Sequence, residues 1–151
     1  MAAPRFEVFT GAKRRQGPVR HLLGLTLDGA DGLQAVLAAL GPEAVRAAAA
    51  ALYREAEAIM TASKEIVPVD QGILKGTGHV ELPEVRGGAV EVVMGYGGPA
   101  APYAIYVHED VMLRHKPGQQ AKYLEQPALE AAEGMEGRLA DALRPGLEGR
   151  S

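Results

Sequence analysis

Four histidines are the side chains of this sequence best suited to acid–base or metal chemistry, and they are His21, His79, His108 and His115. A helical zinc protease needs two histidines four residues apart with a glutamate beside the first. His108-Glu109 is followed by a histidine only at His115, and the segment between them has no clear helical pattern. A two-histidine metal site stays an alternative, but we expect the histidines to be structural or solvated.

Nucleophiles are scarce in the chain. Serine occurs only at Ser63, inside a helical pattern, and at Ser151, so an α/β-hydrolase elbow has no nucleophile. The absence of cysteine excludes disulfides, thiolate zinc sites and cysteine nucleophiles. The glycine-rich segments do not end in Gly-Lys-Ser or Gly-Lys-Thr, so they are not phosphate loops. The sequence predicts no enzyme, no catalytic residue, no metal site and no cofactor; a small hydrolase dependent on His108 or His115 is a weaker alternative.

Charge and hydropathy restrict the partners. The 151 residues are about one domain, and the net charge of −3 argues against a protein that mainly wraps nucleic acid. A local contact with DNA or with an acidic partner is a separate hypothesis, carried by Lys13, Arg14, Arg15 and Arg20 around a loop whose ordinary interpretation is a solvated turn. No run of 18 apolar residues exists, and the first residues lack the order of a secretion signal. We expect a soluble, unexported protein without a membrane partner.

An unusual junction at residues 66–76 joins a long helical pattern to an extended region. Pro68 cannot continue a helix and disfavours helical geometry at Val67, so the helix is expected to stop near Glu65. Asp70 is expected to hydrogen-bond a backbone amide two residues on, and Gly72 permits a positive φ. The segment therefore predicts a structural turn built on Pro68, Asp70 and Gly72.

Helical periodicity indicates three helices. A short helix is expected over 33–40 behind candidate N-caps at Asp28 and Asp31, and a long one from Pro42 to about Glu65. In the long helix, apolar or small residues recur every seven positions, which predicts a buried stripe: Val45, Leu52, Ile59, Ala49, Ala56 and Ser63. A last helix is expected from Pro127, weakened by two glycines and ended by Pro145-Gly146.

Alternating patterns indicate strands over 5–10 and 19–27, and a hairpin of strands 79–86 and 89–96 across Gly87-Gly88. A further strand is expected over 103–108. This order predicts an α+β fold: a small antiparallel sheet with one long central helix, a short preceding helix and a C-terminal helix packed on one face. We expect an N-terminal arm or hairpin with a basic tip over 1–20, one domain over 21–145 and a flexible tail over 146–151.

Two long loops, 95–102 and 110–120, exceed what is needed to connect compact elements, and such loops often serve partners. The second combines apolar residues with positive charge, as protein interfaces do. The candidate interface residues on these loops are Gly95, Tyr96, Pro99, Pro102, Val111, Met112, Leu113 and Arg114.

Six fragments in order resemble the neck and tail-completion proteins of long-tailed bacteriophages, a family of head–tail connector and minor tail components. They are Leu-Asp-Gly-Ala-Asp-Gly-Leu, Pro-Glu-Ala-Val-Arg, Val-Pro-Val-Asp-Gln-Gly-Ile-Leu-Lys, Met-Gly-Tyr-Gly, Tyr-Ala-Ile-Tyr-Val-His-Glu and Lys-Tyr-Leu-Glu-Gln-Pro-Ala-Leu. The likeness covers about residues 23–143. Similar proteins usually carry threonine where this chain has Gln71, so the resemblance does not extend to a hydroxyl contact in this turn, whereas Asp70 and Gly72 keep its geometry.

The resemblance implies a structural role in the virion. Such proteins form rings, here expected to hold six or twelve copies, that join portal, adaptor or stopper proteins to tail-tube proteins and leave a channel for genomic DNA. The resemblance further implies assembly in the host cytoplasm and location in the neck or tail of the particle. Long loops and sheet edges are the expected contact surfaces between neighbouring subunits.

Overall fold

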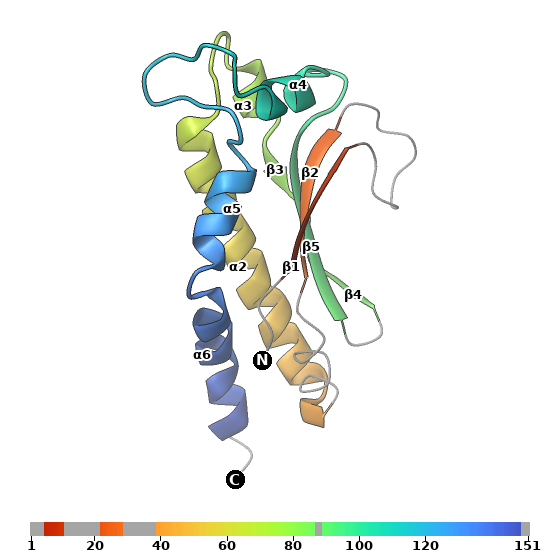
Figure 1. The fold of residues 1–151 in the computed structure, drawn as a ribbon. Helices are drawn as coiled ribbons and strands as arrows, with labels where there is room; N and C mark the ends of the chain where they lie inside the picture. Colours follow the sequence, from red (N-terminus) through yellow and green to blue (C-terminus); the bar gives the residue numbers. More distant parts are fainter. Residues whose placement is uncertain (1–4, 11–21, 29–38, 87–88, 149–151) are drawn as a thin grey trace.

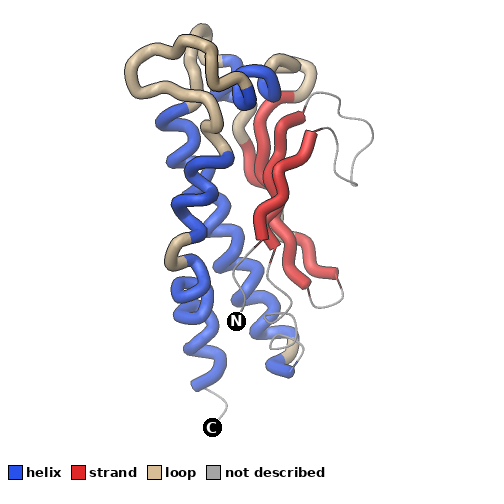
Figure 2. Tube along the Cα trace, viewed as in Figure 1, coloured by secondary structure: helices blue, strands red, loops and turns tan. Residues whose placement is uncertain are grey.

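The computed structural model describes residues 5–10, 22–28, 39–86 and 89–148. These residues form two layers, an antiparallel sheet and a layer of helices that covers one of its faces (Figure 1, Figure 2). The α+β fold predicted from the sequence is confirmed. The predicted helix over 33–40, its candidate N-cap Asp31, His21 and the basic tip lie outside the described residues, apart from the helical Ala39 and Leu40. The other candidate N-cap, Asp28, is the last residue of a strand.

Within the described ranges, the sheet has five strands in the order β1-β2-β5-β3, with β4 pairing further along β5. Strand β1 (Arg5–Thr10) forms an antiparallel hairpin with β2 (Leu22–Asp28), and β2 pairs antiparallel with β5 (Ala89–Gly97). The first strands predicted from the sequence are therefore correct. Because β2 pairs with β1 on one side and with β5 on the other, residues 5–10 belong to the same sheet as β5.

The predicted strand 79–86 is interrupted. It consists of β3 (His79–Val80) and β4 (Glu84–Arg86), both paired with β5. Val80 lies opposite Met94 and Glu84 opposite Glu91, so three residues on this strand face two on β5. The extra residue is a β-bulge. Pro83 contributes to it, since proline has no amide proton for the ladder.

Helix α2 (Pro42–Ile66) is the long helix predicted from the sequence. Its buried face packs against β5 and carries small residues beside Leu52, Ile59 and Met60, which lets the helix approach the sheet closely. The helix ends at the extended cap residue Val67, directly before Pro68. The predicted stripe is confirmed at Leu52, Ala56, Ile59 and Ser63, while Val45 and Ala49 are only partly buried.

The segment predicted as a strand over 103–108 is helix α4 (Ala104–Glu109). The strand prediction is wrong. Within this segment the buried residues are Ala104 and His108, which are four apart, and that spacing places them on one face of a helix. The carbonyl oxygen of Ala104 accepts a hydrogen bond of 2.7 Å from the Tyr123 hydroxyl, which lies in the core. The segment is short enough for its sequence to suit either a strand or a helix. The contact with the distant Tyr123 side chain therefore favours the helix.

The predicted last helix is two helices, α5 (Glu125–Ala132) and α6 (Met135–Glu148), which pack on α2. They are separated at Gly134, whose φ of 76° is left-handed. The predicted end at Pro145 is also wrong, as is a tail that starts at 146, because α6 continues to Glu148. Pro145 lies inside the helix, where it lacks the amide that would donate to the Asp141 carbonyl. None of the described helices has the length and apolar character needed to cross a membrane.

Candidate functional site

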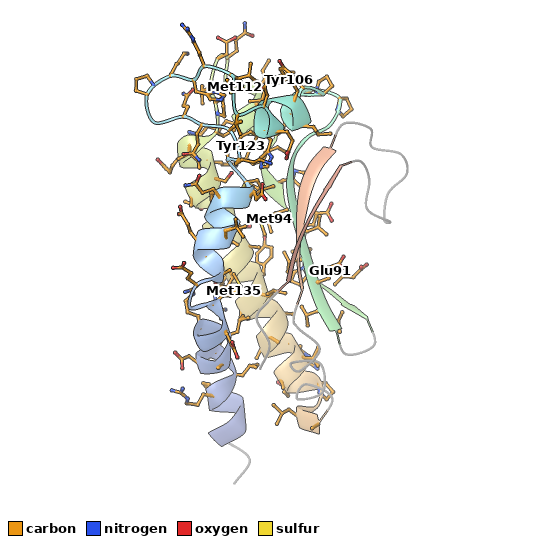
Figure 3. The ribbon with its side chains drawn as sticks, viewed as in Figure 1. Glu91, Met94, Tyr106, Met112, Tyr123 and Met135 are labelled. Carbon is orange, nitrogen blue, oxygen red and sulfur yellow. The ribbon has the colours of Figure 1, made fainter. Side chains whose placement is uncertain are left out.

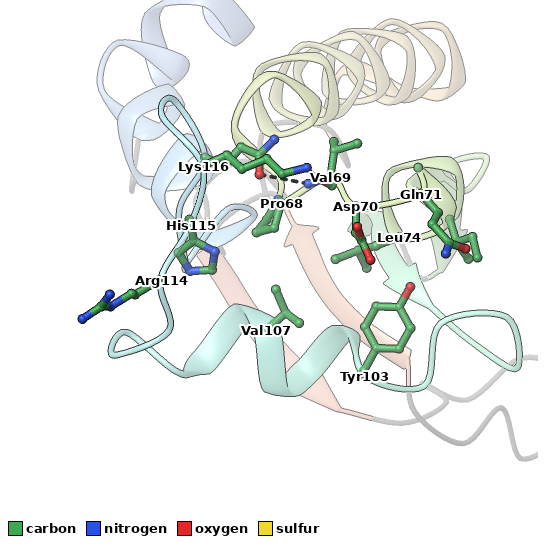
Figure 4. A pocket seen from close by; sticks show the side chains of 13 residues that line it. Pro68, Val69, Asp70, Gln71, Leu74, Tyr103, Val107, Arg114, His115 and Lys116 are labelled. Carbon is green, nitrogen blue, oxygen red and sulfur yellow. Dashed lines mark hydrogen bonds between the residues drawn. The ribbon is translucent and has the colours of Figure 1, made fainter.

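The junction at 66–76 forms one wall of a pocket of about 510 Å³ (Figure 4). Residues 68–72 and the short helix α3 (Ile73–Gly76) supply this wall, and α4 and the loop 110–120 supply the rest. The three segments meet at one end of the molecule (Figure 1). The segment that sequence analysis identified as a turn is therefore also the wall of a concave site.

Three hydrogen bonds fasten the loop 110–120 to the junction. The Val69 amide donates to the Gln119 side-chain oxygen at 3.1 Å, and the Val69 carbonyl accepts from Lys116 Nζ at 3.0 Å. The Gln120 amide donates to the Ile66 carbonyl at 3.0 Å. Both polar groups of the Val69 backbone are thus satisfied by side chains from about fifty residues away. This pairing fixes the shape of the pocket before any partner arrives.

The turn itself differs in part from its prediction. Gly72 has the expected positive φ, 80°, and serves as the N-cap of α3. The Asp70 carboxylate is exposed and makes no hydrogen bond to a described residue, so the predicted bond to a backbone amide is absent. Asp70 instead lines the pocket, where its charge is available to a partner.

The pocket has an apolar floor and a basic wall. Pro68, Leu74, Tyr103 and Val107 contribute apolar surface, and the consecutive residues 114–116, Arg-His-Lys, line the opposite side. Within the described part of the chain, the His115 Nε2 atom is buried without a hydrogen-bond partner. Asp70 adds one carboxylate to the lining, so the two cations of Arg114 and Lys116 leave an excess of positive charge. Such a pocket suits a ligand that offers apolar groups together with negative charge or a hydrogen-bonding group.

Exposed apolar side chains gather around the pocket. Met112 is 85% exposed, and Tyr106, Val111, Tyr103 and Ile73 are exposed as well. Tyr106 and Met112 lie at the same end of the molecule, while Tyr123 points into the core below them (Figure 3). We call these five residues the end surface. Large apolar side chains grouped in this way are typical of a protein–protein contact.

The candidate interface residues of the two loops separate into two groups. Pro99, Pro102, Val111, Met112 and Arg114 are exposed, and Leu113 is partly exposed. Gly95 and Tyr96 are a correction, because β5 extends to Gly97 and both residues are buried within it. Tyr96 is in the core, where its hydroxyl shares a hydrogen bond of 2.7 Å with Ser63 Oγ. Burial raises the pKa of Tyr96 to about 12, although the bond to Ser63 acts in the opposite direction.

His108 is a buried structural histidine. Its Nδ1 donates to Glu109 Oε1 at 2.7 Å, and its Nε2 accepts from the Glu125 amide at 3.2 Å, an arrangement that requires the neutral ring with its proton on Nδ1. The ring also contacts Tyr123 edge-on, with centroids 4.9 Å apart. Burial lowers the pKa of His108, against the raising effect of the Glu109 bond. Its role is to connect α4 to the start of α5.

The group of His108, Glu109 and Glu125 does not suit a metal ion, although its ligand atoms lie within 4.8 Å of one another. Both ring nitrogens already have partners, and the Lys122 ammonium lies 2.5 Å from Glu109 and 3.2 Å from Glu125. A cation would have to displace that ammonium and break the bond at the start of α5. The hydrogen bond from Lys122 lowers the pKa of Glu109, so this carboxylate is already neutralised by a neighbour.

The sequence did not indicate four of the residues that complete the pocket: Tyr103, Val107, Lys116 and Gln119. His115 was a candidate there only as a metal ligand or hydrolase residue. The strand predicted over 103–108 concealed the helical face of the first two. Lys116 and Gln119 carry no local signal, since their role depends on Val69 far away in the sequence.

The fold and the site define a class: an α+β protein that, in its described part, presents a basic and apolar pocket beside an exposed apolar surface. No protein-family model, no curated protein and no solved structure matches the chain.

Proposed function

We propose that this protein is a structural subunit of a bacteriophage head–tail connector ring. In this role it joins the portal, adaptor or stopper proteins to the tail tube, and the ring leaves a channel for genomic DNA. The proposal begins from the resemblance of six ordered fragments to neck and tail-completion proteins. The assembled particle is then where the protein acts, after assembly in the host cytoplasm.

The observation that carries the proposal is the end surface. Met112, Val111 and Tyr106 are large apolar side chains on a loop and a short helix, each more than half exposed. A protein that works alone in water gains nothing from such a group, whereas a subunit buries it against a neighbour. The loop that carries Met112 is fastened to the junction by the Lys116 and Gln119 side chains, so the surface is preorganised for contact.

Overall charge is compatible with the channel. Phosphate binding is dominated by lysine and arginine, so a subunit with a net charge of −3 does not hold passing DNA tightly. The nucleic-acid-binding alternative depends on Lys13, Arg14, Arg15 and Arg20, which lie outside the described residues. Nothing in the described fold favours it over a connector.

The test is deletion of the gene from the phage that encodes this chain, with complementation in trans. We expect deletion to leave filled heads and tails that do not join, and wild-type protein to restore whole particles that contain it. Complementation with Met112→Asp, which replaces an exposed side chain, should restore far fewer. Joined, infectious particles without the protein would contradict the proposal.

A further inference from the structure

We propose that the bulge between β3 and β4 of one copy inserts into the junction pocket of a second copy. The inserted segment is Glu81-Leu82-Pro83-Glu84, which we call the knob. This inference rests on the proposed ring and names the contact that builds it. It assigns the pocket to another copy of this chain.

The knob has the shape of an inserting element. Leu82 is 76% exposed and lies between the ends of β3 and β4, whereas Glu81 and Pro83 on either side of it are partly buried. The bulge places an extra residue in this strand, and the Glu81 amide still donates to the Val93 carbonyl at 2.8 Å. The backbone on the N-terminal side of Leu82 is therefore held to the sheet. A fixed backbone with a protruding leucine loses little entropy on binding.

The knob and the pocket match in chemistry. The knob presents apolar Leu82 and Pro83 beside the carboxylate of Glu81, and the pocket presents an apolar floor with two cations and the single carboxylate of Asp70. The cations are those of Arg114 and Lys116. The pocket has a volume of about 510 Å³, within the range of roughly 300–1,000 Å³ typical of binding pockets. Opposite charges around an apolar centre are the usual arrangement of a specific contact. The knob also offers the acidic group that the basic wall of the pocket suits.

The contact cannot be satisfied within one copy, because Leu82 is exposed and is not among the residues that line the pocket. The pocket lies at the end formed by α3 and α4, whereas β4 lies toward the other end of β5 (Figure 1). A contact between two different surfaces of identical subunits is heterologous, and it closes into a ring when the rotation per subunit divides the circle. Insertion of the knob of one copy into the pocket of the next therefore produces a ring, which is the assembly that a connector needs.

Two charge variants and their mixture test the contact. Leu82→Arg disables the knob, and Arg114→Glu disables the pocket; both residues are exposed, so the fold is expected to persist, which circular dichroism and thermal unfolding check. The matched control is Leu129→Arg, a leucine on α5 that is 59% exposed and lies outside both surfaces. Light scattering over a concentration series gives the mass of each species.

We expect the wild type and Leu129→Arg to associate alike, and each of the two test variants to associate roughly ten-fold or more weakly. An equimolar mixture of Leu82→Arg and Arg114→Glu should form a dimer and stop there. The reason is that one chain has an intact knob, the other an intact pocket, and neither has both. A wild type that stays monomeric at every concentration, or test variants that assemble as the wild type does, would overturn the contact.

Disulfide trapping gives a second measurement, because the chain has no cysteine of its own. Chains carrying Leu82→Cys and chains carrying Ile73→Cys, with different mass tags, are mixed and oxidised. We expect cross-linked heterodimers in excess over a mixture of Leu129→Cys with Ile73→Cys, and equal yields would overturn the contact. Variants that assemble normally while the protein is found in particles would reject only this contact; absence from particles would reject the proposed function instead.

Discussion

The hydrogen bond between Ser63 and Tyr96 satisfies two polar groups in the core, both fully buried. Ser63→Ala leaves the tyrosine hydroxyl without a partner, which we expect to cost about 1–3 kcal/mol of unfolding free energy. Adding Tyr96→Phe removes the stranded hydroxyl, so the double variant should be more stable than Ser63→Ala alone. Urea unfolding of the wild type, the two single variants and the double variant measures the free energy of unfolding of each protein. A double variant destabilised by the sum of the two single effects would contradict the coupling.

Gly72 is the glycine at which the junction needs a left-handed backbone. A Cβ there meets no atom within 4 Å, so the cost of Gly72→Ala comes from its φ of 80° alone, about 1–2 kcal/mol. Gly76→Ala is the control, because Gly76 also has open space and its φ is not in the left-handed range. We expect thermal unfolding to show destabilisation by the first substitution and little change or a gain with the second.

His108 makes stability depend on pH in a specific window. Its pKa is lowered from the ordinary 6.5 by burial, so the folded state resists a proton that the unfolded state accepts. Stability is therefore complete above pH 6.5 and is lost as the pH falls below that value, with a slope of at most about 1.4 kcal/mol per pH unit. The charged groups facing the ring are Glu109, Lys122 and Glu125.

The measurement for His108 is urea unfolding between pH 7.5 and 5.5, compared with His108→Gln. We expect the wild type to lose stability more steeply than the variant over this range, although the variant is less stable throughout. Glu109 contributes in another window, because its lowered pKa matters only as the pH falls below its ordinary 4.5. Parallel slopes in the two proteins would contradict the neutral, buried ring.

At the scale of elements, long periodic segments were predictable and short ones were not. Helix α2 has twenty-five residues, so its apolar stripe repeats often enough to exclude a strand. The six residues of α4 fit either period, and contacts of Ala104 and His108 with residues after 120 decide between them. The bulge before β4 was likewise hidden, because register depends on which residues of β5 lie opposite.

Arg138 connects three helices. Its guanidinium binds the Glu55 carboxylate of α2 with two bonds, at 2.7 and 2.9 Å, and donates to the Ala131 and Glu133 carbonyls at the end of α5. We expect Arg138→Ala to cost about 1–2 kcal/mol, more than an exposed ion pair, because it also strands carbonyls at the helix end.

The control for Arg138 is Arg144→Ala. Arg144 is in the same helix and makes one exposed ion pair with Asp141, so its loss should cost less than about 0.5 kcal/mol. Urea unfolding compares the two variants. Equal effects would show that the link from α6 to α2 and α5 adds nothing to stability.

At the scale of the whole molecule, the sequence located half of the candidate site. The unusual chemistry of Pro68 and Gly72 indicated the junction, and the composition of 110–120 indicated a contact loop. Their meeting was not predictable, since it depends on Lys116 and Gln119 bonding the Val69 backbone across the fold. Tyr96 was predicted to lie in an interface loop because a single tyrosine between glycines is typical of a loop. In the structure, β5 continues through Tyr96 to Gly97.

In the function proposed for this chain, its folded surface forms the contacts of a ring. The most direct measurement is the mass of the purified protein, alone and mixed with the portal, stopper or tail-tube protein of the same phage, by native mass spectrometry. We expect a closed assembly of six or twelve copies, alone or on one of these partners. A chain that remains monomeric alone and with each partner would contradict it.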